Sequence, residues 1–142
     1  MSELTPDIGA GTEWLIDAAN CSADALRDES LLSEVFARVI REVGLRVVGE
    51  IRWHSFPDPG GVTGFAMLSE SHLCCHTYPE FQTATFNLYC CNERPAWDWS
   101  ANLRELLGAW RVKVRVISRN IGPARPFQPA EAEQGLRGGA RK

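Results

Sequence analysis

The feature that most constrains the fold of this chain is a cluster of titratable side chains at 68–80, which lies between two apolar runs. The segment holds two of the three histidines, two of the five cysteines and two glutamates. The flanking runs at 62–68 and 83–91 have the apolar character of buried strands. Titratable groups in such a setting must each be desolvated or paired, which costs free energy. The segment therefore predicts a functional site held between strands of a sheet.

Apolar periodicity outside this segment predicts an α+β domain. Alternation or continuous apolar character predicts five strands, at 13–18, 47–56, 62–69, 83–91 and 110–116. An apolar stripe predicts a helix over 32–43 that ends at Gly44, and a second helix begins at Pro95 and ends at Gly108. Residues 20–28 are interpreted as a connecting loop or an irregular first turn. The order β-α-β-β-β-α-β favours a two-layer sandwich, in which two helices cover one face of an antiparallel or mixed sheet.

The two ends of the chain differ from its centre in composition. Residues 1–10 are mostly polar and are expected to be flexible. Residues 120–142 contain three prolines and are otherwise rich in Gly, Ala, Arg and Glu, which predicts a disordered tail. One domain is therefore predicted over 11–119, and this length is sufficient to build a hydrophobic core.

Composition argues against several classes of function. The net charge of −3 gives no general attraction for nucleic acid, and the only local excess of cations is at Arg111, Lys113 and Arg115. No apolar run approaches the length of a membrane span, and the N-terminus does not resemble a signal peptide. An odd number of cysteines, four of them in adjacent pairs, is typical of reduced thiols. A cytoplasmic protein without nucleic-acid or membrane partners is predicted.

The cysteines also raise the alternative of a zinc-binding module. Cys74, Cys75, His76, Cys90 and Cys91 are possible ligands. Structural zinc sites favour Cys-x-x-Cys spacing, whereas adjacent cysteines on a strand point to opposite faces. At most one cysteine of each pair would then reach the same ion, so no metal site is predicted.

The motifs of the central segment resemble those of a known enzyme family. Gly-Val-Thr-Gly at 61–64, Glu-Ser-His-Leu at 70–73 and His-Thr-Tyr-Pro-Glu at 76–80 closely resemble the short prokaryotic S-adenosylmethionine decarboxylases. The resemblance extends over roughly residues 11–119. Members of that family cut themselves at a Glu-Ser bond and convert the serine into a pyruvoyl group. The resemblance therefore implies cleavage between Glu70 and Ser71, a covalent pyruvoyl cofactor and a homodimer.

The resemblance also implies catalytic roles. Decarboxylation of an α-amino acid needs an electron sink on the amine, and no unmodified side chain supplies one. Ser71 would provide the pyruvoyl group, with which the substrate amine forms a Schiff base. His76 matches the histidine that assists self-cleavage, and Cys91 matches the cysteine that protonates the carbanion after carbon dioxide leaves. Thr63 stands where a serine hydroxyl usually supports processing. Cys90 would then be a packing residue, although strand register could exchange the two cysteines.

Two further residues match positions that bind substrate in this family. Phe56 matches an aromatic residue that contacts the adenine or the sulfonium, and an aromatic face attracts such a cation. Glu80 matches a glutamate that binds the ribose hydroxyls. Ser71 and His76 would lie on opposite faces of a regular strand, so we expect a bend or bulge between them.

Departures from the family pattern leave the substrate open. Tyr78 stands for the commoner Trp, Asn87 for Asp and Asn92 for Gly. The leading hypothesis is a decarboxylase of S-adenosylmethionine, whose product donates aminopropyl groups in spermidine synthesis. The alternatives are the same chemistry on ornithine or arginine, which some members of the family decarboxylate, and an unprocessed paralogue that binds a ligand without turnover.

Overall fold

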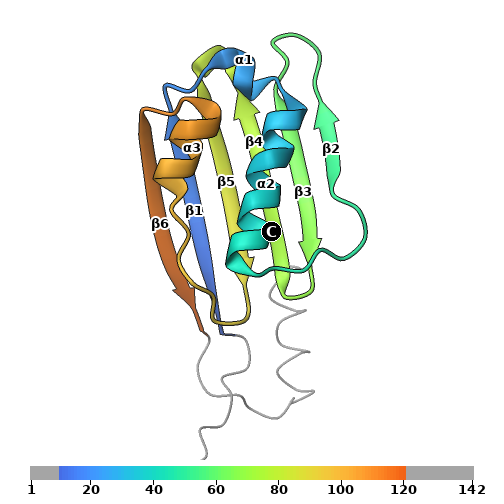
Figure 1. Cartoon of the computed structure of the whole chain (residues 1–142), viewed down its shortest axis with the longest axis vertical. Helices are drawn as coiled ribbons and strands as arrows, with labels where there is room; N and C mark the ends of the chain where they lie inside the picture. The colour runs from blue at the N-terminus through green and yellow to red at the C-terminus, as the bar shows by residue number, and fades with distance from the viewer. Residues whose placement is uncertain (1–9, 121–142) are drawn as a thin grey trace, which may run out of the picture.

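The computed structural model describes residues 10–120, which form one sheet with helices on one of its faces (Figure 1). The strand order is β2-β3-β4-β5-β1-β6, and every pairing is antiparallel. The strands are β1 (Gly11–Ala19), β2 (Arg52–Ser55), β3 (Val62–Leu68), β4 (Ser71–Tyr78), β5 (Thr83–Cys90) and β6 (Arg111–Arg119). The predicted α+β two-layer class is confirmed. The predictions of a flexible start at 1–10 and a disordered tail at 120–142 concern residues outside the described range, apart from their boundary positions.

The sheet has six strands where the sequence predicts five, because the segment that carries the site is itself a strand. β4 pairs in continuous register with β5 from Ser71 to Tyr78 and with β3 from Ser71 to His76. The bend or bulge predicted within this segment is therefore wrong. β2 is shorter than the predicted strand at 47–56, since Gly49 adopts φ 74° and leaves only a single bridge at Val47 before Arg52.

The helices begin where polar side chains cap them. Asp28 accepts hydrogen bonds from two backbone N–H groups at the start of α2 (Glu29–Val43), and Gly44 ends this helix at φ 79°. A short helix, α1 (Ala23–Leu26), occupies part of the predicted loop. The predicted start of the second helix at Pro95 is wrong. α3 (Trp99–Leu107) begins four residues later, where Asp98 accepts the N–H of Ala101.

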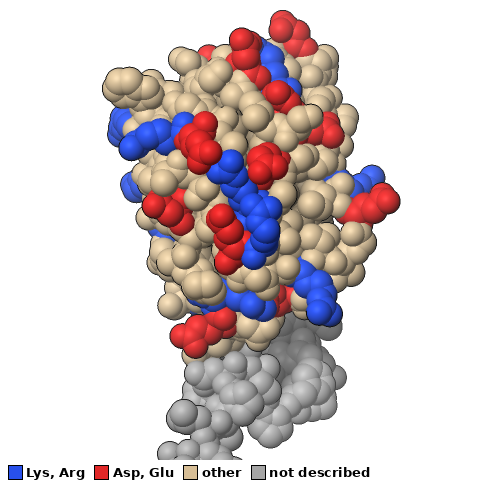
Figure 2. Space-filling model, viewed as in Figure 1, with Lys and Arg blue, Asp and Glu red and all other residues tan. Residues whose placement is uncertain are grey.

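The core lies between the helices and the sheet, and it is built from alternate residues of the strands. The buried strand residues include Ile16, Ala18, Leu73, Cys75, Phe86 and Leu88, and the helices contribute Leu32, Phe36, Val39, Leu103 and Leu107. Figure 2 shows the outer surface of these helices, where acidic and basic side chains are intermixed. Arg38 pairs there with Glu34 and Glu105.

The opposite face of the sheet, called the open face below, is not covered by α2 or α3 (Figure 1). Phe65 and Met67 of β3 are 40% and 52% exposed there. Within residues 10–120, no helix has the length and apolar character to span a membrane.

Candidate active site

A two-residue turn, Ser69–Glu70, joins β3 to β4 and carries the predicted cleavage site. Leu68 and Ser71 pair directly across it. Two-residue hairpin turns ordinarily place positive φ on one or both turn residues. Here the positive φ falls instead on the next residue, Ser71, at 152°. Such a conformation costs a non-glycine residue about 1–3 kcal/mol. Backbone strain is therefore concentrated immediately after the Glu70–Ser71 bond.

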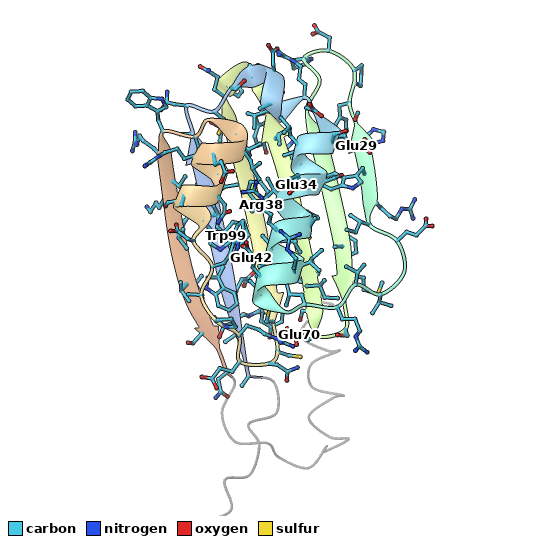
Figure 3. The ribbon with its side chains drawn as sticks, in the orientation of Figure 1. Glu29, Glu34, Arg38, Glu42, Glu70 and Trp99 are labelled. Carbon is cyan, nitrogen blue, oxygen red and sulfur yellow. The ribbon has the colours of Figure 1, made fainter. Side chains whose placement is uncertain are left out.

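The side chain of Glu70 is held by the segment that follows β5. It is only 3% exposed, and Arg94 binds it through two nitrogens, Nε to Oε1 at 2.6 Å and Nη2 to Oε2 at 2.5 Å. Asn92 Nδ2 donates a further hydrogen bond to Oε2 at 2.9 Å. The hydrogen bonds from Arg94 hold the pKa of Glu70 below its ordinary value, although burial acts in the opposite direction. Figure 3 shows Glu70 at the lower end of the sheet.

The backbone of the same segment also contacts the peptide bond that is predicted to break. The N–H of Cys91 donates to the carbonyl oxygen of Glu70 at 3.0 Å. This hydrogen bond withdraws electron density from the carbonyl carbon and would stabilise an oxyanion formed on attack. The carbonyl is therefore polarised before any reaction begins.

The two adjacent cysteines have different environments. Cys90 is the last residue of β5, is buried on the helix-covered face and pairs with Ser71. Burial, with the nearby Glu70 carboxylate, raises the pKa of the Cys90 thiol to about 12. Cys91 lies just beyond the strand and is exposed. A thiol that must give up a proton and recover it is better placed at Cys91 than at Cys90, which stays protonated at neutral pH.

Thr63 and His76 meet on the open face. They are direct partners across β3 and β4, and Thr63 Oγ1 lies 2.6 Å from His76 Nδ1. The hydroxyl and the imidazole therefore share a hydrogen bond, which orients the ring. Thr63 thus presents its hydroxyl to the ring.

A small pocket of about 280 Å³ adjoins this pair, and its lining includes Phe56, Tyr78 and Glu80. The His76 ring packs edge-on against two aromatic rings, with centroids 5.8 Å from Phe56 and 4.5 Å from Tyr78. Glu80 is exposed, in the short 3-10 helix η1 (Pro79–Phe81) that follows β4. The structure thus brings together Thr63, His76, Phe56 and Glu80.

Ser71 and Cys91 do not join that group within one chain. Ser71 is the first residue of β4, whereas His76 is five residues further along the same regular strand. At the usual rise per residue, this separation is roughly 17 Å. The sequence-predicted residues therefore form two clusters at opposite ends of the sheet: the cleavage cluster (Glu70, Ser71, Cys91) and the histidine cluster (Phe56, Thr63, His76, Glu80).

Two residues near these clusters were missed by sequence reasoning. His54 packs edge-on against Phe56 with ring centroids 4.5 Å apart. Period-2 alternation places residues 54 and 56 on one face, so this contact had a signal in the sequence. Arg94 had no such signal in the sequence, because it lies in an irregular segment between β5 and α3. Among the described residues, no three His, Cys, Asp or Glu side chains converge as a metal site.

Glu70 is expected to stabilise the fold above about pH 4.5 and to lose this effect on acidification. Its ordinary pKa of 4.5 is lowered in the folded chain, so the unfolded chain binds the proton more readily. The stabilisation is full above the unfolded value and disappears as the pH falls through the lower, folded value. Urea unfolding between pH 7 and pH 3 checks this, comparing Ser71→Ala with Ser71→Ala/Glu70→Gln, so that neither chain has the Ser71 hydroxyl. The stability difference should shrink below about pH 4.5, and a constant difference would contradict the assignment.

Comparison with known proteins identifies related decarboxylases. A family model described as S-adenosylmethionine decarboxylase matches residues 12–120. S-adenosylmethionine decarboxylase proenzyme 2 of Halalkalibacterium halodurans is 31% identical over 120 residues, covering 84% of this chain and 93% of that protein. S-adenosylmethionine decarboxylase proenzyme of Moorella thermoacetica is 33% identical over 112 residues, covering 78% and 88%.

A solved structure has the same fold. The crystal structure of the adenosylmethionine decarboxylase from Aquifex aeolicus superposes with a TM-score of 0.66 at 25% identity, covering 84% of this chain and 98% of that one. The resemblance inferred from the motifs at 61–64, 70–73 and 76–80 is thus confirmed over most of the chain. The chain belongs to the S-adenosylmethionine decarboxylase family.

Proposed function

We propose that this protein is a self-processing decarboxylase of S-adenosylmethionine, and that its electron sink is a pyruvoyl group made from Ser71. The observation that carries the proposal is the strained Ser71, at φ 152°, next to a carbonyl that already accepts the Cys91 N–H. The substrate is assigned from the names of its relatives. A protein-bound ketone, when present, accepts the electron pair left on the α-carbon as carbon dioxide departs.

The self-cleavage uses atoms of the chain and one water molecule. Ser71 Oγ attacks the carbonyl carbon of Glu70, the C–N bond breaks, and the hydroxyl proton ends on the freed amine. The resulting ester loses the Cα proton of Ser71, and the Cβ–Oγ bond breaks to leave Glu70 as a carboxylate terminus. Hydrolysis by water then exchanges the nitrogen of residue 71 for the oxygen of a ketone, and the nitrogen leaves as ammonia. The Cys91 N–H would stabilise the oxyanion of the first step.

The other residues hold the substrate or move protons. His76, oriented by Thr63, is suited to proton transfer near neutral pH. The exposed Cys91 would protonate the substrate carbon after decarboxylation. Phe56 would face the adenine or the sulfonium, and Glu80 would accept hydrogen bonds from the ribose. The product would donate aminopropyl groups for spermidine synthesis. We place this activity in the cytoplasm, where thiols remain reduced.

We further propose that two copies pair through their open faces. Support comes from the separation of the cleavage cluster from the histidine cluster, and from exposed Phe65 and Met67 on that face. A two-fold axis that lies between two facing sheets and crosses their strands reverses the strand direction of one copy. Such a dimer brings the strand end that carries the cleavage cluster of each copy beside the histidine cluster of the other. Ser71 pairs with Cys90 on the helix-covered side at the first position of β4, so it would have to turn toward the partner at this edge of the sheet.

Freshly purified protein is expected to contain two chains, residues 1–70 and residues 71–142 with a pyruvoyl start. Intact mass under denaturing conditions measures this directly, and Ser71→Ala is expected to remain a single chain because it lacks the attacking hydroxyl. A wild-type chain that stays whole after prolonged incubation would favour the non-catalytic binding paralogue and would remove every catalytic role proposed above.

Cys91→Ala is expected to cleave itself but to release carbon dioxide from S-adenosylmethionine about 100-fold more slowly or worse, because the carbanion loses its proton donor. Cys90→Ala is the matched control and should stay within a few-fold of wild type. The assay measures carbon dioxide released from S-adenosylmethionine, ornithine and arginine in parallel. Turnover of ornithine or arginine but not of S-adenosylmethionine would overturn the substrate assignment.

The composite site predicts complementation between two inactive chains. His76→Ala and Ser71→Ala are each expected to remain uncut when made alone. When the two are made together, a mixed dimer contains one site with an intact Ser71 facing an intact His76. The His76→Ala chain should then be cut, and intact mass distinguishes it from its partner. Absence of cleavage in isolated mixed dimers would contradict the composite arrangement.

A further inference from the structure

We propose that Arg94, assisted by Asn92, is a positioning residue for self-cleavage, holding Glu70 so that its carbonyl stays on the Cys91 N–H. The inference rests on the self-cleavage proposed above. Neither Arg94 nor Asn92 lies in the motifs at 61–64, 70–73 or 76–80. Both come from the irregular segment that runs from the end of β5 toward α3.

The geometry holds residue 70 at both of its polar ends. The carbonyl accepts the backbone N–H of Cys91 at 3.0 Å, while the carboxylate receives the Arg94 fork and the Asn92 amide at 2.5–2.9 Å. All three donors belong to the four residues 91–94. Because one short segment holds both the carbonyl and the carboxylate of Glu70, the plane of the scissile peptide bond has little freedom to rotate.

The Arg94–Glu70 ion pair matters for the position of Glu70 because the carboxylate is buried. The Glu70 side chain is 3% exposed and that of Arg94 is 29% exposed, so the carboxylate has almost no contact with water. A buried carboxylate that loses its cation is strongly disfavoured and moves toward solvent if the backbone allows it. Here the backbone is a two-residue turn, so movement of the side chain would carry the carbonyl away from Cys91.

The strain on Ser71 explains why such a hold is needed. An unfavourable φ persists only where the surrounding structure over-determines the backbone. β3 and β4 fix the turn from one side through the Leu68–Ser71 pair, and the Arg94–Glu70 contact fixes it from the other. Without Arg94 the turn is free to move positive φ onto Ser69 or Glu70, as ordinary hairpin turns do, and Ser71 would relax.

The test follows the rate of self-cleavage by intact mass after cell-free synthesis of the full chain. Arg94→Ala is expected to cleave about 10- to 100-fold more slowly than wild type, the loss expected for hydrogen bonds to a charged group. Arg94→Lys keeps the charge without the two-pronged geometry and should be intermediate. Arg38→Ala, which removes a comparable pairing with Glu105 on the helix surface, is the control and should cleave at the wild-type rate.

Two further measurements separate positioning from a general loss of structure. Dilute guanidinium chloride should restore cleavage of Arg94→Ala, whereas sodium chloride at the same concentration should not, and Arg38→Ala should not respond. The double variant Arg94→Ala/Glu70→Gln should also cleave little more slowly than Glu70→Gln alone, because the two residues act through one contact. Slow cleavage without guanidinium rescue, or effects that simply multiply in the double variant, would overturn the proposal.

The outcomes also distinguish this inference from the proposed function. If wild type does not cleave, the self-processing mechanism itself fails. If wild type cleaves and folded Arg94→Ala cleaves equally fast, self-processing stands and Arg94 has no positioning role. If Arg94→Ala does not fold, Arg94→Lys decides, since cleavage at the wild-type rate would overturn the inference and slower cleavage by a folded protein would support it.

Discussion

The continuous antiparallel register of β3, β4 and β5 is the constraint on which the rest of the structure depends. Because side chains alternate strictly along each strand, the register assigns every residue to the core or to the open face. Leu73 and Cys75 therefore pack beneath the helices, and His76 lies on the opposite face beside Thr63. A shift of the strand register by one residue would move the core residues to the open face and the open-face residues to the core. The core and the histidine cluster therefore require the same register.

The same regularity separates residues that the proposed self-cleavage would bring together. A bulge would have been the local way to unite Ser71 with His76, but the paired residues of β4 contain none. The chain instead leaves one face of its sheet without helices and exposes apolar side chains upon it. If that face meets a second copy, processing becomes dependent on assembly. An unpaired chain would then remain a precursor, however well it folds.

Much of the fold was predictable from sequence because the core pattern is strong. Alternation identified β1, β5 and β6, and helical spacing with Gly44 and Gly108 identified the ends of α2 and α3. The strand β4 was missed because its titratable residues indicated a site, and its extension depends on neighbours on both sides. The motif residues were found through the family resemblance, whereas the two clusters and the Arg94 contact emerge only from pairing and from an irregular segment without periodicity.

The unusual dihedral at Ser71 also bears on the direction of the reaction. The angle φ is defined by the carbonyl carbon of the preceding residue, here Glu70. Once that carbon has left the nitrogen, the dihedral no longer exists, and the strain attached to 152° disappears with it. In the proposed reaction that nitrogen later leaves as ammonia, so the cut chains would not simply rejoin. Release of the strain would add to the free energy that favours the cut form.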